Sequence, residues 1–172
     1  LQGDWSSDVC SSDLPGGMTD TDGVQGADGI VFGLQTVSNS AGGAGGGIGF
    51  QGLPNSVGVE FDTWNNGSVD QNYGNHIGID LNGSMASNPL VSVASIMNDG
   101  SIYNAWVDYN GLTDNLEVRF AQSANRPANP LLSLNVDLEA VLGTPSAYVG
   151  FTSGTGAAFN DHDILSFTFV DD

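Results

Sequence analysis

The side chains of this sequence that could do chemistry together gather in residues 57–81, which read VGVEFDTWNNGSVDQNYGNHIGIDL and contain no Lys or Arg. The residues there that can bind a metal ion are Glu60, Asp62, Asn66, Asp70 and His76. In a strand, alternation sends Glu60 and Asp62 to one face and their apolar neighbours to the other. Carboxylates this close raise one another's pKa unless a cation lies among them. The stretch therefore predicts a metal site.

The ligand types indicate which ions would bind. Carboxylate, amide and carbonyl oxygens suit Ca²⁺, whereas an imidazole beside carboxylates suits Mn²⁺ or a similar transition ion. We therefore expect two neighbouring sites that share two carboxylates. The expected ligands are Glu60 and His76 for Mn²⁺, Asn66 and the backbone carbonyl of Trp64 for Ca²⁺, and Asp62 and Asp70 for both ions. The alternative, a solvated acidic loop between two strands, explains any one of these Asp residues but not the whole set.

The charge balance limits the partners. The chain has 172 residues, with 20 Asp and Glu, two Arg and no Lys, and its formal net charge is −18. A surface this anionic repels nucleic acid and anionic membranes, and it accepts divalent cations and neutral ligands. No run approaches the ~20 apolar residues of a membrane span. We therefore expect no nucleic acid partner and no membrane insertion.

Short runs with period-two alternation recur along the chain, separated by Gly- and Asn-rich turns. The expected strands are residues 30–35, 57–63, 76–81, 90–97, 102–109, 116–121, 131–134, 147–152 and 164–170. In the last of these, we expect Leu165, Phe167 and Phe169 to face inward. Only residues 137–141 suggest a helical turn. Many short strands without a long helical period predict one all-β domain, an antiparallel β-sandwich.

The first residues differ in origin from the rest. Residues 5–14 read WSSDVCSSDL, which is the translation of a common sequencing-library adapter. We therefore expect residues 1–14 to be a non-native tail. If the segment were genuine, its Ser and Asp content would still predict a flexible tail. Residues 15–172 are then the domain, a fragment whose N-terminal strands are truncated. Cys10 is the only cysteine and falls in the tail, so cysteine usage does not indicate a compartment.

Several short motifs agree in sequence and order with one protein family. They are ADG at 27–29, GGGIGF at 45–50, VEFDTW at 59–64, HIGID at 76–80 and HDILSFTF at 162–169. Together they resemble the legume-type (L-type) lectins of the concanavalin A-like superfamily over residues 26–170. The resemblance implies a jelly-roll β-sandwich, Ca²⁺ and Mn²⁺ that stiffen a loop, neutral glycans as partners, and a secreted or cell-surface protein. Whether the protein forms a homo-oligomer or belongs to a larger multidomain chain stays open.

The resemblance also implies a saccharide site beside the metal loop. It predicts a cis peptide between Ala27 and Asp28, and an Asp28 carboxylate that accepts hydrogen bonds from two sugar hydroxyls. The other expected contacts are the backbone N–H of Gly46, the ring of Trp64, the Nδ2 amide of Asn66, and Ala157 and Ala158 in the loop 153–161. His162 follows this loop, and we expect it to be structural.

Two other functions stay open at this point. A laminarinase-like glycoside hydrolase would use a Glu-x-Asp-x-x-Glu run, but Asn65 occupies the position of the second Glu. Without that general acid we expect no enzyme. A structural or adhesive module of a larger surface protein, whose Ca²⁺ only stiffens a loop, would keep the metal ligands and lose the sugar contacts.

Overall fold

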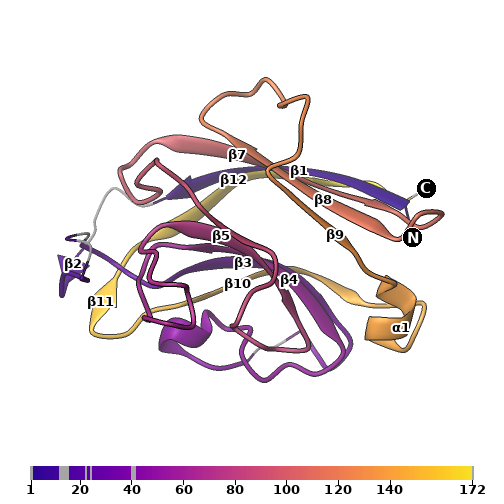
Figure 1. Ribbon diagram of the computed structural model, residues 1–172, viewed down its shortest axis with the longest axis horizontal. Helices are drawn as coiled ribbons and strands as arrows, with labels where there is room; N and C mark the ends of the chain where they lie inside the picture. The colour runs from indigo at the N-terminus through magenta and orange to yellow at the C-terminus, as the bar shows by residue number, and fades with distance from the viewer. Residues whose placement is uncertain (1, 12–15, 22, 24, 40–41, 172) are drawn as a thin grey trace.

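The computed structural model describes residues 2–11, 16–21, 23, 25–39 and 42–171, and it stacks two β-sheets face to face (Figure 1). The strands are β1 (Gln2–Ser11), β2 (Gly16–Gly17), β3 (Gly29–Gln35), β4 (Ser56–Asp62), β5 (His76–Leu81), β6 (Leu90–Ser92), β7 (Ile102–Asn110), β8 (Asn115–Ala121), β9 (Leu132–Asn135), β10 (Tyr148–Gly154), β11 (Ala158–Phe159) and β12 (His162–Phe169). The first sheet has the order β12-β1-β7-β8-β9, and the second has the order β10-β3-β4-β5-β6. Every pairing is antiparallel, including that of β11 with β2. The predicted antiparallel sandwich is confirmed.

The helical content is small. The α-helix α1 (Leu138–Leu142) begins after Asp137, whose carboxylate accepts a hydrogen bond from Ala140 N at 2.9 Å, and it ends at Gly143 in the left-handed conformation. The helical turn expected at residues 137–141 is therefore confirmed. The only other helix in the described part of the chain is a 3-10 turn, η1 (Gly45–Gly47). No helix of the described residues has the length and apolar character needed to cross a bilayer.

Strand β6 is shorter than the sequence predicts. The pattern predicts a strand over 90–97, but the strand ends at Ser92. Val93 N still donates to Asn75 O, and Met97 N donates to Asn75 Oδ1 at 2.9 Å. The chain therefore leaves the sheet to wrap around Asn75, a contact that strand alternation does not encode.

Residues 2–11, expected to be part of a flexible tail, instead form β1. This strand lies between β7 and β12, with Trp5 opposite Val107 on one side and Phe169 on the other. Pairing in a sheet uses backbone N–H and C=O groups, so almost any extended segment can fill such a place. The pairing with β7 and β12 thus places these residues inside the first sheet, which their composition does not predict.

The hydrophobic core has two parts. The main core lies between the sheets and includes Val59, Phe61 and Ile77. A smaller core covers the opposite face of the second sheet, and its residues are Val31, Ile48, Phe50, Leu53 and Met85. The two loops that supply most of the smaller core therefore cover the face to which Glu60 and Asp62 point, so these carboxylates cannot belong to a solvated loop.

The apolar face of β12 is only partly covered. Phe167 packs against Phe32 and Phe151, with ring centroids 6.0 and 5.2 Å apart. Even so, the exposed fraction is 53% for Leu165, 40% for Phe167 and 38% for Phe169. The inward orientation predicted from alternation holds for Phe167, but β10 and β12 are both edge strands, so nothing in the described chain closes the sandwich beside them.

This difference within β12 predicts unequal effects of substitution. Phe167→Ser should lower the free energy of unfolding by about 2 kcal/mol, because it removes a ring that touches two others. Leu165→Ser should change it by less than about 0.5 kcal/mol, and it should reduce self-association by shrinking an exposed apolar edge. Urea unfolding and light scattering measure the two effects. Equal destabilisation by both changes would contradict the packing described here.

Candidate functional site

The register between β4 and β5 brings the predicted Mn²⁺ ligands together. Asp62 lies opposite His76, and Glu60 lies opposite Gly78. One ligand atom each from Glu60, Asp62 and His76 lies within 4.8 Å of the others, and all three side chains are at most 1% exposed. Two carboxylates and an imidazole at this separation suit a divalent ion of the Mn²⁺ type.

Gly78 provides the space that this arrangement needs. A Cβ built on Gly78 would lie 2.7 Å from Glu60 Oε1 and 2.5 Å from Ser87 Oγ. Both distances are too short for any real side chain. Position 78 therefore has to be glycine if the Glu60 carboxylate is to lie over β5 beside the imidazole.

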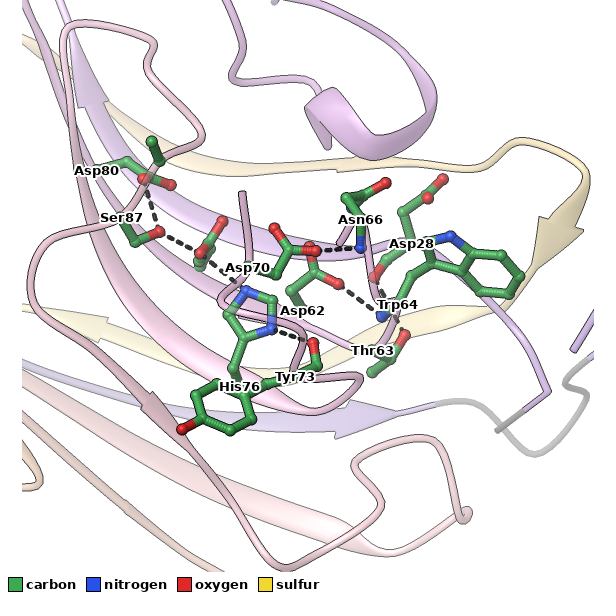
Figure 2. Close-up of polar contacts among 12 residues, drawn as sticks. Asp28, Asp62, Thr63, Trp64, Asn66, Asp70, Tyr73, His76, Asp80 and Ser87 are labelled. Atoms are coloured by element: carbon green, nitrogen blue, oxygen red, sulfur yellow. Dashed lines mark hydrogen bonds and ion pairs between the residues drawn. The ribbon is translucent and has the colours of Figure 1, made fainter. Parts of the chain in front are cut away.

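The hydrogen bonds of His76 indicate how its ring would meet a metal. Nδ1 lies 3.2 Å from Tyr73 O, and Nε2 lies 3.1 Å from Glu60 Oε1 (Figure 2). A carbonyl oxygen can only accept, so Nδ1 carries the hydrogen, and in a neutral ring Nε2 then has a lone pair that faces a carboxylate oxygen. Two facing acceptors need a positive species nearby, either a proton or a metal ion. The contact to Tyr73 O is the kind of outer contact that orients a metal-bound histidine.

The loop after β4 folds around two carboxylates. Trp64 N donates to Asp62 Oδ1 at 2.6 Å, and Asn66 N donates to Asp70 Oδ2 (Figure 2). Burial raises the pKa of Asp62 well above its usual value, and the charges of Glu60 and Asp70 raise it further. Burial also raises the pKa of Asp70, and the Asn66 N–H opposes this. The structure thus brings Asp62 and Asp70, the predicted shared ligands, into one electrostatic cluster.

Two further polar residues join this cluster that the sequence did not single out. Ser87 Oγ donates to Glu60 Oε1 and lies 2.8 Å from Asp80 Oδ1 (Figure 2). Burial first, and then the charge of Glu60, raise the pKa of Asp80 to about 9. Asp80 lies two residues beyond Gly78 in β5, so the same alternation that selected Glu60 and Asp62 also places it on this face. No strand period in the sequence predicts that Ser87 lies here.

No Arg is near enough to balance these acids. The two Arg residues of the chain, Arg119 and Arg126, both bind the Asp108 carboxylate, each at 2.5 Å. Asp108 is in β7 of the other sheet. The carboxylates of the second sheet therefore have only His76 as a positive partner from a side chain, which leaves a need for bound cations.

Asp28 is buried beside the cluster with one oxygen unused. The Ala27–Asp28 peptide is cis, as the resemblance implies. Asp28 is 5% exposed, and its Oδ2 has no hydrogen-bond partner. Burial first, and then the charge of Asp70, raise the pKa of Asp28 to about 6. A buried carboxylate oxygen without a donor is costly unless a ligand supplies one.

Glycines allow the neighbouring segments to approach Asn66 and Asp28 closely. A Cβ on Gly46 would lie 2.8 Å from Asn66 Oδ1, and a Cβ on Gly156 would lie 3.7 Å from Asp28 Oδ2. Two small residues thus let η1 and the loop 153–161 approach the acid cluster. Ala157 is exposed, whereas the Ala158 side chain is 2% exposed. The surface that this loop offers next to Asp28 is therefore formed by residues 156 and 157 more than by the Ala158 side chain.

His162 lies apart from this cluster. Its side chain lines a small apolar cavity together with Ile30, Phe61 and Tyr103. Burial lowers its pKa. A neutral imidazole among apolar side chains fits the structural role that the sequence analysis gave it.

Comparison with known proteins identifies the family. The family model for the legume lectin domain matches residues 17–172 of the sequence. The chain therefore belongs to that family of non-catalytic carbohydrate-binding proteins. A curated relative, the L-type lectin-domain containing receptor kinase VIII.1 of Arabidopsis thaliana, is 34% identical over an alignment of 148 residues, which covers 82% of this chain and 20% of the relative. The rice (Oryza sativa subsp. japonica) L-type lectin-domain containing receptor kinase SIT2 is 36% identical over an alignment of 124 residues, which covers 64% of this chain and 18% of the kinase. The chain spans about a fifth of the length of these relatives.

Solved structures agree with the fold. Basic winged bean lectin, in complex with Tn-antigen, superposes with a TM-score of 0.78 at 27% identity, over 98% of this chain and 70% of that one. Lectin UEA-II, in complex with galactose, superposes with a TM-score of 0.74 at 26% identity, over the same shares of both chains. The family and the absence of a second Glu at position 65 argue together against the hydrolase alternative.

The raised pKa values predict an unusual pH dependence for the metal-free protein. Each raised carboxyl holds its proton more tightly in the folded than in the unfolded chain, so the free energy of unfolding falls as the pH rises through these values. The carboxyls concerned are Asp28, Asp62, Asp70 and Asp80. With chelator present, the melting temperature should be higher at about pH 5 than at about pH 8. Added Ca²⁺ should remove this difference by stabilising the ionised carboxylates, and a metal-free protein that is more stable at the higher pH would contradict the assignment.

Proposed function

We propose that this lectin domain binds neutral saccharides in a calcium-dependent way at the site formed by Asp28, the loop after β4 and the loop 153–161. The observation that carries the proposal is the unpartnered Oδ2 of Asp28, which is buried near two other buried acids, Asp62 and Asp70. A sugar hydroxyl is a donor of the kind that this oxygen lacks. The winged bean and UEA-II structures, with their carbohydrate ligands, support a saccharide as the source of that hydroxyl.

The metal ions would stiffen the loop rather than take part in a reaction. Glu60 and His76, with Asp62 and Asp70, would hold Mn²⁺ or a similar ion, in keeping with the donor set described above. The side chain of Asn66, the backbone carbonyl of Trp64 and the same two shared carboxylates would hold Ca²⁺. The ions would supply the positive charge that the buried acids need, and they would fix the loop that carries Trp64 and Asn66.

The sugar contacts follow from what each group can offer. Asp28 would accept from two hydroxyls, while Gly46 N–H and the Nδ2 amide of Asn66 would donate to ring or hydroxyl oxygens. Trp64 would place its ring against the apolar face of the pyranose. Ala157 and Ala158 would close the far side of the site, mainly through their backbone. Such a site is shallow and polar, so it selects hydroxyl geometry more than size.

The setting of the domain follows from its relatives. We infer a secreted or cell-surface location, since related domains occur in receptor kinases and in plant lectins. We propose that the native domain is residues 15–172 and that residues 1–14 are non-native, as the adapter-like reading of residues 5–14 indicates, although residues 2–11 pair as β1 between β12 and β7.

Calcium dependence predicts a change in thermal stability. EDTA should lower the melting temperature by roughly 5–10 °C relative to protein in Ca²⁺ at about 100 times its dissociation constant, because binding to the folded state alone stabilises it by about 2.7 kcal/mol. Added Ca²⁺ should restore the original value, and Mg²⁺ serves as the control because it prefers stricter octahedral geometry. A melting temperature indifferent to both chelator and Ca²⁺ would rule out the metal sites.

The role of Asp28 predicts a selective loss of binding. Asp28→Ala should weaken binding to a glycan array by roughly 100-fold, because two charge-assisted hydrogen bonds are lost. The stabilisation by Ca²⁺ should persist, since Asp28 is not among the proposed ligands. Asp163→Asn, a change of an exposed acid on β12, is the matched control and should bind normally. Array binding that survives Asp28→Ala would move the saccharide site elsewhere.

A further inference from the structure

Three segments that are distant in the sequence meet beneath the saccharide site. The carbonyl oxygen of Asp28 accepts two hydrogen bonds from Thr63, from its N at 2.8 Å and from its Oγ1 at 3.1 Å (Figure 2). Asp28 N in turn donates to Gly154 O at 3.0 Å. Thr63 directly follows Asp62 and is 2% exposed. The backbone of Asp28 is therefore held on one side by the end of β4 and on the other by the end of β10.

The third contact comes from Asn160, between β11 and β12. Its Nδ2 donates to Thr63 Oγ1 at 3.1 Å, and its side chain is 6% exposed. Asn160 closes the loop that carries Ala157, so it connects that loop through one hydroxyl to the Asp28 carbonyl. The hydrogen bond that Asn160 donates goes to Thr63, which is not a proposed metal ligand.

The hydrogen positions in this chain of contacts are determined. A carbonyl oxygen cannot donate, so the single hydrogen of Thr63 Oγ1 points to Asp28 O. The hydroxyl must then accept from Asn160, which requires an amide nitrogen at this position. An ionised carboxylate in place of the amide would present only acceptors to Thr63, so Asn and Asp are not equivalent here.

The same amide also packs against the residue two before Asp28. A Cβ on Gly26 would lie 2.0 Å from Asn160 Oδ1 and 2.9 Å from Asn98 Nδ2. Gly26 has a φ of 102°, which other residues rarely adopt. Asn98 Nδ2 also donates to Gln25 O at 2.6 Å. Two buried amides therefore enclose the segment that leads into Asp28, and only Asn160 also reaches Thr63.

We propose that Asn160 is a positioning residue for saccharide binding, because it fixes the Asp28 carboxylate relative to the loop 153–161 through Thr63. The inference rests on the proposed function, since it assigns Asp28 to the sugar. It adds a residue that touches neither the sugar nor the metal ions, yet sets the separation of two walls of the site.

The test uses Asn160→Ala together with two changes at Thr63. Asn160→Ala should weaken glycan-array binding by about 10-fold, the effect typical of losing an outer contact that orients a binding group. Thr63→Val removes the same hydroxyl in a side chain of equal shape and should weaken binding similarly, whereas Thr63→Ser keeps the hydroxyl and should bind normally. The double variant Asn160→Ala with Thr63→Val should bind no worse than the weaker single variant, because both changes break one chain of contacts.

Two further readouts separate positioning from a general loss of stability. The Ca²⁺ concentration that gives half the thermal stabilisation should stay within about 2-fold of the original in Asn160→Ala. Amide hydrogen exchange should accelerate at Asp28 and Thr63. Asn98→Ala is the matched control, because it removes a buried amide beside Gly26 that does not contact Thr63, and it should leave exchange at Thr63 unchanged.

The outcomes distinguish this inference from the proposed function. Unchanged exchange at Asp28 and Thr63 in Asn160→Ala overturns the inference, as does normal array binding or an equal loss of Ca²⁺ affinity. If the original protein binds no glycan, the proposed function fails, and the exchange data still decide whether Asn160 holds Asp28. If Asn160→Ala does not fold, Thr63→Val and Thr63→Ser give the same comparison.

Discussion

Negative charge buried without an equal amount of positive charge is the constraint on which this structure depends. The carboxylates on the outer face of the second sheet are covered by loops, and both Arg residues of the chain are engaged on the other sheet. Desolvated like charges repel strongly, so the folded chain must either keep protons that it would lose at neutral pH or take up cations. At His76, whose Nε2 faces Glu60 Oε1 at 3.1 Å, either a proton or a bound cation would satisfy the two facing acceptors.

That constraint explains how the sandwich produces a binding site. The sheets themselves are stabilised by apolar burial, and the strand register only needs to place a few polar groups on the outer face. The loop after β4 has little apolar surface of its own, and it is shaped by hydrogen bonds from Trp64 and Asn66 to two of the buried acids. Its conformation therefore depends on the protons or cations that neutralise those acids. The affinity for a sugar that contacts this loop would depend on them as well.

Much of this could be predicted from the sequence, for identifiable reasons. Alternation alone places Glu60 and Asp62 together, because the period of a strand is fixed, and the polar loop between two strands indicates the metal cluster. Ser87 could not be found this way, since it lies in the connection between β5 and β6, where no strand period places it beside Glu60. The pairing of β1 could not be predicted either, because the hydrogen bonds of a sheet join backbone groups and do not require a particular set of side chains. The contact between Asn160 and Thr63 joins residues 97 apart and depends on the whole topology.

Gly78 has a consequence for comparing members of this family. Because Gly78 has no side chain, the Glu60 carboxylate and the Ser87 hydroxyl can lie where a Cβ would otherwise be. A homologue with a larger residue at this position must displace one of them. Such a homologue could keep every acidic residue in its alignment and still be unable to bring these two side chains together beside His76. This single position can therefore divide related sequences into those that can form the acid cluster as this chain does and those that cannot.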